Sequence, residues 1–423
     1  KTRRYSPHRT HFTVRALIKE TMRHCCLSLL TASFLSVVGS STAFLVDVSS
    51  SRSNPPRVDH VDAQMATADE AIDGSTSTRR GWIKKVVGGA VATGIVANKI
   101  AIEGPEPFVP PSGSLEGKVV IITGGNTGLG LESAKRLAFG GATVVMTTRS
   151  TTKGSMAVKD VKDYLSKNSV FNDNVFALPL DLCDMASVRA FPDLLKQSPA
   201  LAGGKTIDVL MNNAGVMAIP DRQLTKDGFE RTFQTNHLGH FALTALLAPL
   251  LNPAGSRVVN VSSMAHLIAG DGLDFSNLNG EKDYGPWKSY GYSKLENILF
   301  TKELQRRSDE AGMKITTVAL HPGAVRTDLQ RNIIGEEKYA TMNDSKPGPL
   351  DMALLLPAVY FTKAVDRGAT SQIWLAAGQG NDVGGKFYIN CKETALGKTA
   401  MDMDQAKKLW SLSEKMSGVQ FNL

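Results

Sequence analysis

Apolar positions along this chain fall into short β-branched runs that alternate with longer stretches of helical spacing. In the segment KVVIITGGNTGLGLESAKRLAFGGATVVMTTR, Lys118–Thr123 and Thr143–Thr148 are β-branched runs, and Leu131–Phe139 between them carries apolar residues at helical spacing. Runs of this kind are typical of strands buried in a parallel sheet. The segment is therefore predicted to form a strand–helix–strand unit.

Glycines stand at positions 124, 128 and 130, between the first strand and the helix of this unit. A glycine turn before a helix lets a nucleotide pyrophosphate approach the helix N-terminus, where backbone N–H groups and the helix dipole favour an anion. The spacing G-x-x-x-G-x-G is a weak signal by itself, because glycine clusters also mark ordinary tight turns. The turn is thus a candidate nucleotide site that needs support from the rest of the chain.

The same alternation continues along the body of the chain. Helices are predicted at Lys153–Lys167, Met185–Lys196, Gly228–Leu251 and Tyr290–Arg307, where Gly228–Leu251 is one long helix or two joined helices. Strands are predicted at Val175–Leu180, Ile207–Met211, Arg257–Val261 and Lys314–Leu320. This order predicts an α/β fold with a doubly wound parallel sheet, a Rossmann fold, which binds its ligand at the carboxyl ends of the strands. Unusual polar or glycine-containing motifs follow these ends: LDL at 180–182, NNAG at 212–215, SS at 262–263 and HPG at 321–323.

Charge and composition divide the chain into a leader and a body. Residues 1–104 hold 14 Lys and Arg against 8 Asp and Glu, whereas the rest of the chain holds 34 against 32. The body therefore offers no basic surface for nucleic acid. Residues 105–114, rich in Pro and Gly, are predicted to be a linker. Residues 115–423 are predicted to form a single catalytic domain after an N-terminal targeting leader.

The leader combines features of several targeting signals. Residues 22–43 have a basic start, the apolar run Cys26–Val38 and a small-residue exit, which is typical of a signal peptide and too short to span a bilayer. Residues 44–80 then resemble the transit part of the leaders of proteins that enter plastids of red-algal origin. Residues 78–97 contain Arg79-Arg80 before a mildly apolar run, and resemble either a twin-arginine signal or a peripheral segment that rests on a membrane. The prediction is a plastid location, in the stroma or the thylakoid.

The cysteine content does not indicate a disulfide-rich or metal-binding protein. Of the four cysteines, only Cys183 and Cys391 belong to the body. Two distant cysteines make neither a disulfide framework nor a zinc site, so no metal is predicted.

Taken together, TGGNTGLG, LDL, NNAG, the helix that contains Asn236, NVSS, YGYSK and HPG resemble the short-chain dehydrogenase/reductase family over residues 115–423. Within it, MAHLIAGDGLDFSNLNGEKDY, SKLENILFTKEL and GKFYINC resemble the retinol dehydrogenase group, with the protochlorophyllide reductases as a neighbouring branch. The resemblance implies a Rossmann-fold oxidoreductase that transfers a hydride to or from a carbonyl or alcohol carbon. Because members of this family usually form homo-oligomers, the resemblance also implies one here.

Tyr290 and Lys294 are the candidate proton-transfer pair. Residues four apart on a helix share one face, and an ammonium beside a phenol is expected to lower the phenol's pKa from about 10. YxxxK also occurs by chance on amphipathic helices, but the surrounding motifs favour the functional interpretation. Tyr292 has no lysine four residues on. Lys288, four residues after Tyr284, is predicted to precede the helix.

The resemblance implies roles for the neighbouring residues. Ser263 would hydrogen-bond the substrate carbonyl oxygen and position it for Tyr290, while Ser262 packs in the strand. Asn236 would hold a water in a proton relay to Lys294; the alternative is that it caps or kinks its own helix. The implied catalytic residues are Asn236, Ser263, Tyr290 and Lys294.

Cofactor choice depends on the residue after the second strand. An acidic residue there would accept the adenosine ribose hydroxyls, but this chain has Arg149, which can pair with a 2′-phosphate or be an ordinary solvated arginine. NADP(H) is therefore the predicted cofactor. By resemblance, Asp181 contacts the adenine, Asn213 lines the nucleotide cleft, and 321–323 with Thr327 pack the nicotinamide amide. The predicted cofactor-binding set is Thr123, Gly124, Asn126, Gly128, Leu129, Gly130, Arg149, Asp181, Leu182, Asn213, Ala214, Gly215, Tyr290, Lys294, Pro322, Gly323, Val325 and Thr327.

The sequence gives less information about the substrate than about the cofactor. Arg326–Leu350 and the apolar Met352–Phe361 would form a flap that admits a bulky apolar molecule, such as a retinoid-like or other isoprenoid carbonyl, a quinone or a fatty aldehyde. The same residues would also suit a flap helix packed on the core.

Two other functions stay open. The first is a protochlorophyllide-type double-bond reductase, but that branch uses an active-site cysteine, and neither Cys183 nor Cys391 falls in the flap. The second is a dehydrogenase-fold subunit of a plastid membrane complex that senses the NADP redox state or serves as a scaffold. Intact Ser263, Tyr290 and Lys294 argue against a purely structural role.

Overall fold

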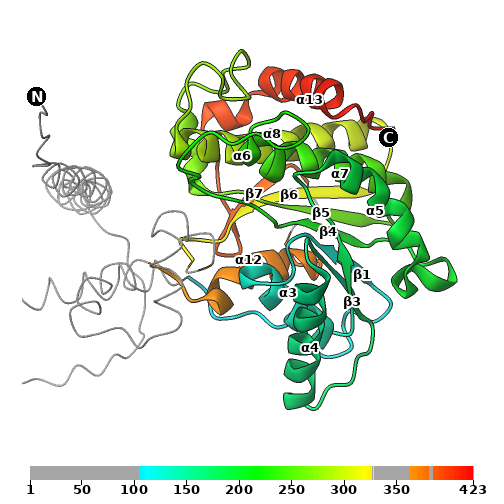
Figure 1. Cartoon of the computed structure of the whole chain (residues 1–423). Helices are drawn as coiled ribbons and strands as arrows, with labels where there is room; N and C mark the ends of the chain where they lie inside the picture. The colour runs from blue at the N-terminus through cyan, green and yellow to red at the C-terminus, as the bar shows by residue number, and fades with distance from the viewer. Residues whose placement is uncertain (1–103, 326, 328–361, 381–383, 423) are drawn as a thin grey trace, which may run out of the picture. The chain divides into compact units, whose positions relative to one another are not determined.

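The computed structural model describes residues 104–325, 327, 362–380 and 384–422 (Figure 1). The leader signals predicted at 22–43, 44–80 and 78–97 lie outside these residues, as does the predicted flap apart from Thr327. The helices are α3 (Gly128–Phe139), α4 (Thr151–Lys167), α5 (Met185–Gln197), α6 (Arg231–Phe233), α7 (Gly239–Leu247), α8 (Pro286–Glu310), α12 (Val365–Ala376) and α13 (Met403–Ser417). The strands are β1 (Val119–Ile122), β2 (Thr143–Thr148), β3 (Val175–Pro179), β4 (Val209–Asn212), β5 (Ser256–Val261), β6 (Ile315–His321), β7 (Lys386–Ile389) and β8 (Lys392–Glu393).

These strands form one sheet in the order β3-β2-β1-β4-β5-β6-β7-β8, and all neighbours are parallel except β7 and β8. The predicted doubly wound Rossmann fold is confirmed. The chain order reverses between β2-β1 and β4, so that Val120 pairs with Val144 of β2 on one side and Val209 of β4 on the other. In such sheets the ligand crevice lies at this switch point, beyond the carboxyl ends of the strands.

Helices cover both faces of the sheet (Figure 1). One face carries α3, α4 and α12, and the other carries α5, α7 and α8, with α13 packed beside α8. β1 and β2 are buried along their whole length. This explains why they read as continuous apolar runs rather than as alternating patterns.

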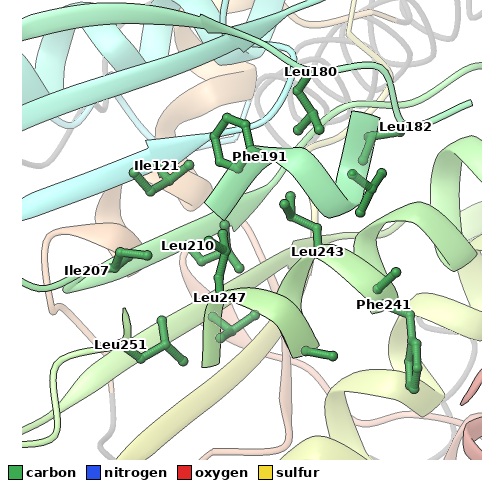
Figure 2. Packing of buried hydrophobic residues seen from close by; sticks show 14 of the residues in the cluster. Ile121, Leu180, Leu182, Phe191, Ile207, Leu210, Phe241, Leu243, Leu247 and Leu251 are labelled. Carbon is green, nitrogen blue, oxygen red and sulfur yellow. The ribbon is translucent and has the colours of Figure 1, made fainter. Parts of the chain in front are cut away.

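Alternate residues of β1 enter different cores. Val120 and Ile122 pack with α3 and α4, whereas Ile121 faces the cluster on the other side, together with Leu210 of β4 (Figure 2). There Phe191 of α5 contributes to the same cluster and is fully buried. The two clusters hold the strand ends at fixed positions, so motifs far apart in the sequence meet at one edge of the sheet.

The stretch Gly228–Leu251, predicted as one long helix or two joined helices, is helical but is divided into more pieces than that. Its helical part begins at Arg231 and is divided into α6, a π-helical segment η2 (Gln234–Leu238), α7 and a final 3₁₀ turn η3 (Ala248–Leu250). The Glu230 carboxylate caps the start by accepting hydrogen bonds from the backbone N–H groups of Thr232 and Phe233, each at 2.8 Å. An N-cap of this kind sets where the helix begins.

The prediction that Tyr290 opens its helix is wrong. α8 begins at Pro286, one turn earlier. Proline suits the first helical position because its missing N–H would have no partner there. Lys288 therefore lies inside the helix rather than before it. The sequence patterns also did not predict α12, α13, β7 and β8.

Residues 105–114, the predicted linker, contain no helix or strand but lie against the domain. Arg136 of α3 donates to the Phe108 carbonyl oxygen at 3.2 Å, and Arg367 of α12 pairs with Glu106 at 2.7 Å. The segment therefore packs on the same helices that border the switch point.

No helix in the described part of the chain is long and apolar enough to cross a membrane.

Candidate active site

The turn between β1 and α3 is shaped by glycines at positions where a side chain would not fit. Gly124 and Gly128 have φ values of +62° and +54°, which lie in the left-handed region that favours glycine. A Cβ on Gly130 would lie 2.7 Å from Asn213 Nδ2 and closer still to the Gly124 carbonyl oxygen. The backbone thus forms a close cradle at the N-terminus of α3, which suits a pyrophosphate.

Buried hydrogen bonds tie this turn to the end of β4. Thr123 Oγ1 accepts from the backbone N–H groups of Asn213 at 2.9 Å and Ala214 at 3.0 Å. Asn213 Nδ2 donates to the Thr123 carbonyl oxygen at 2.8 Å, and its Oδ1 accepts from Gln372 Nε2 of α12 at 3.1 Å. The side chains of Thr123 and Asn213 therefore hold the crevice walls in register.

The chain after β6 returns over the glycine turn. Thr327 Cγ2 lies 3.3 Å from the position that a Cβ on Gly128 would occupy. Val325 is buried and packs against Gly368 of α12, and Gly323 has a φ of +98°. Thr327 is thus brought beside Gly128, and Val325 and Leu129 both lie against Gly368. Asn126 lies partly exposed in the glycine turn.

The far end of the crevice contains Arg149 and Asp181. Arg149 follows β2 and is exposed, and Asp181 Oδ1 accepts from the Cys183 backbone N–H at 2.9 Å. Burial raises the pKa of the Cys183 thiol, and the charges of Asp181 and Arg149 act on it in opposite directions. The two charged groups therefore lie near the same thiol.

Two predicted cofactor residues have side chains in the core. Leu182 is 5% exposed and belongs to the cluster in Figure 2, and Leu129 packs with α4 and α12 on the opposite face.

Ser263 lies two residues after the end of β5 and is the N-cap of the 3₁₀ segment η4 (Met264–Ala269). Its Oγ accepts from the Ala265 backbone N–H at 3.1 Å, and its side chain is near enough to Tyr290 to act on the pKa of that phenol. Ser262 is buried, as predicted for a packing residue, and its Oγ donates to the Lys294 carbonyl oxygen at 2.6 Å. This bond fastens α8 to the end of β5.

Tyr290 and Lys294 come together on one face of α8, as their spacing predicts. Lys294 Nζ lies 5.5 Å from the centroid of the Tyr290 ring and donates to the Val261 carbonyl oxygen at 3.0 Å. Both side chains are buried, Tyr290 at 8% and Lys294 at 4% exposure. Ser263, Tyr290 and Lys294 therefore form one cluster at the carboxyl end of β5.

The expected lowering of the Tyr290 pKa is wrong for this structure. Burial raises the pKa of Tyr290 to about 12, although the hydrogen bond from Ser263 acts in the opposite direction. Burial also lowers the pKa of Lys294 to about 8. Desolvation disfavours the charged form of both groups and is the largest cause of each shift. Tyr290 is therefore a protonated phenol at neutral pH, able to donate a proton.

Asn236 lies in the π-helical segment η2, fully buried. Its Oδ1 accepts from the Val216 backbone N–H at 2.8 Å, and its Nδ2 donates to the Val216 carbonyl oxygen and to Ser293 Oγ, both at 2.9 Å. A Cβ on Gly215 would lie 3.2 Å from Asn236 Oδ1 and 3.7 Å from Lys294 Nζ. Asn236 thus joins the NNAG loop to α8 beside Lys294, at a helix irregularity of the kind frequent in functional sites.

Sequence reasoning missed two buried polar residues near this site. Gln372 of α12 is fully buried and donates to Asn213 and to Ser133 Oγ of α3. Lys363 is 4% exposed and crosses Gly323. Gln372 is one of several polar residues in α12, so the sequence gives no signal that it is buried, and Lys363 has no local signal either.

The described residues contain no group of three or more His, Cys, Asp or Glu side chains that could hold a metal ion. Cys183 and Cys391 are both free thiols.

Comparisons show which known proteins this chain is similar to. The model of the short chain dehydrogenase family matches residues 118–338. Human retinol dehydrogenase 12 is 39% identical over 311 residues, which cover 73% of this chain and 88% of the relative. Human retinol dehydrogenase 13 is 37% identical over 316 residues, covering 74% and 88%. A crystal structure of an uncharacterized protein from Mycobacterium paratuberculosis matches with a TM-score of 0.55 and 36% identity, covering 75% of this chain and all of that one.

Proposed function

Because the chain belongs to the short-chain dehydrogenase family, we propose that it is an NADP(H)-dependent oxidoreductase acting on the carbonyl or alcohol group of a bulky apolar substrate. The observation that carries this proposal is the cluster of Ser263, Tyr290 and Lys294 beside the glycine turn. The relatedness to retinol dehydrogenases supports a substrate of retinoid-like or other isoprenoid character, or a quinone or fatty aldehyde.

The residues present fit a dinucleotide. The glycine cradle at the N-terminus of α3 would hold the pyrophosphate, and Arg149 would pair with the 2′-phosphate of NADP(H). Lys294 would reach the nicotinamide ribose, with Pro322, Gly323 and Thr327 at the nicotinamide amide. When bound, the nicotinamide supplies or accepts the hydride.

Side chains of the protein would bind the substrate oxygen and transfer the proton to it. Ser263 hydrogen-bonds the substrate oxygen and holds it beside Tyr290. In the reducing direction the Tyr290 hydroxyl, which is protonated at neutral pH, gives its proton to that oxygen. Because burial raises the pKa of Tyr290 to about 12, this transfer needs a group that stabilises the phenolate. Lys294 stands beside Tyr290 as a cation that stabilises the phenolate formed. Asn236 positions the Val216 backbone next to Lys294.

The proposed function is tested with a panel of carbonyl compounds. NADPH oxidation should accompany reduction of long apolar aldehydes, retinoid-like aldehydes or quinones, and kcat/KM should rise with apolar size. The same assay includes a pigment whose only reducible group is a conjugated double bond. If that pigment is reduced while none of the carbonyl compounds reacts, the protein is a double-bond reductase and this proposal is wrong. Inertness of every compound with NADPH and NADH would favour a redox-sensing or structural subunit.

Cofactor choice is tested at Arg149. Arg149→Ala should raise KM for NADPH about 10- to 100-fold and leave KM for NADH nearly unchanged, because a hydrogen bond to a charged group contributes about 1.5–3 kcal/mol. Steady-state kinetics with both cofactors on one substrate measure the two effects. The matched control is Arg367→Ala, since Arg367 pairs with Glu106 and follows no strand end. An equal rise for both cofactors would show that Arg149 does not recognise the phosphate.

A further inference from the structure

Lys363 is a buried lysine next to the turn that follows β6. Its side chain is 4% exposed, and its backbone N–H donates to the Ala324 carbonyl oxygen at 2.7 Å. This bond belongs to a parallel bridge between Val325 and Lys363. The residue is therefore anchored to the backbone that connects Gly323 to Thr327.

The Lys363 side chain crosses Gly323 at close range. A Cβ on Gly323 would lie 2.6 Å from Lys363 Cε and 2.9 Å from its Nζ. Real Cβ atoms do not approach so closely, and the φ of +98° at Gly323 also favours glycine. The ammonium thus lies against the HPG turn because residue 323 has no side chain.

The ammonium has an uncharged partner. Lys363 Nζ donates to Asn390 Oδ1 at 2.5 Å, in the turn between β7 and β8. Within the described residues no carboxylate pairs with Lys363 or with Lys294, whereas the nearby Arg367 is paired with Glu106. Two buried cations at this end of the sheet are therefore left without a counter-ion from the described residues.

The effect of these charges on a neighbour is visible at His321. Burial lowers the pKa of His321 to about 3, and the charges of Lys363 and Lys294 act in the same direction. Burial lowers the pKa of Lys363 itself, and the charge of Arg367 acts in the same direction. The Cys391 thiol also faces Lys363 and is neutral while protonated. The surroundings of the HPG turn are thus set to disfavour an added positive charge.

We propose that Lys363, a buried cation beside Gly323 that pairs with no carboxylate among the described residues, makes the protein bind NADPH more tightly than NADP⁺. This inference rests on the proposed function, which puts the nicotinamide at the HPG turn. The two cofactor forms carry the same phosphates and differ at the nicotinamide ring, which is positive in NADP⁺ and neutral in NADPH. A fixed cation nearby attracts the phosphates of both forms alike but repels only the oxidised ring. The ratio of the two affinities therefore isolates this effect.

The experiment measures the dissociation constants of NADPH and NADP⁺ for the wild type and three variants, by fluorescence titration and calorimetry. Lys363→Met should lower the ratio Kd(NADP⁺)/Kd(NADPH) by about three- to tenfold, the range that partly screened unit charges give near a protein surface. Lys363→Arg keeps the charge and should keep the ratio within about twofold. Lys302→Met removes another half-buried lysine, bound to the Gly385 carbonyl oxygen at the opposite end of β7, and should also leave the ratio unchanged.

Each outcome decides the matter. A fall in the ratio for Lys363→Met alone supports the inference. If Lys363→Met changes the dissociation constants of NADPH and NADP⁺ by the same factor, or changes neither of them, Lys363 does not distinguish the two cofactor forms. The inference is then overturned, while the proposed function stands. If the wild type binds neither NADPH nor NADP⁺, the proposed function and this inference are both overturned.

Discussion

Tyr290→Phe is expected to lower turnover of a confirmed carbonyl substrate by about 10²–10⁴-fold, the usual contribution of a positioned general acid. The change removes one hydroxyl and keeps the ring, whose centroid lies 6.2 Å from that of Trp287. The fold and the NADPH affinity should therefore survive. The measurement compares kcat with the dissociation constant of NADPH. Full activity of this variant would show that the proposed proton donor is wrong.

Two other tyrosines provide matched controls. The Tyr284 hydroxyl donates to the Ile219 carbonyl oxygen at 2.7 Å, so Tyr284→Phe should cost about 1 kcal/mol of stability without a comparable loss of turnover. Tyr292 has the Lys288 ammonium 5.7 Å from its ring centroid, a contact that phenylalanine retains. If Tyr284→Phe were the inactive variant instead, the catalytic motif would lie six residues earlier than we propose.

Gly130→Ala is expected to weaken NADPH binding by at least about tenfold and to lower the free energy of unfolding by about 1–3 kcal/mol. The added methyl group would overlap the Gly124 carbonyl oxygen and lie 2.7 Å from Asn213 Nδ2. Relief of this overlap must move the glycine turn or break the bond from Asn213 to Thr123, and both changes distort the anion cradle. Cofactor titration and urea unfolding measure the two effects.

Gly397→Ala is the control for this prediction. Gly397 has a φ of −69° and no atom within 4 Å of an added Cβ. Its replacement should change stability by less than about 0.5 kcal/mol and leave NADPH affinity unaltered. Wild-type affinity in Gly130→Ala would mean that the cofactor does not use the turn between β1 and α3.

Local sequence patterns predicted those features that depend only on residues within one short segment. The β-branched runs of β1 and β2 predicted their bounds closely, since strands buried on both faces must be apolar throughout. Helical spacing likewise predicted that Tyr290 and Lys294 share a face. The boundary of α8 was missed because the prediction ignored Pro286, whose ring suits the first helical turn.

The sequence by itself therefore determined the strand–helix alternation, the glycine turn and the pairing of Tyr290 with Lys294, because each depends on residues close together in the chain. Only the tertiary structure decided which polar groups meet across the fold. Gln372 meets Asn213 from 159 positions away, and Lys363 crosses Gly323. It also decided the sign of the Tyr290 pKa shift, since desolvation depends on everything packed around the ring. Burial and long-range contact are properties of the folded chain, and no short segment contains them.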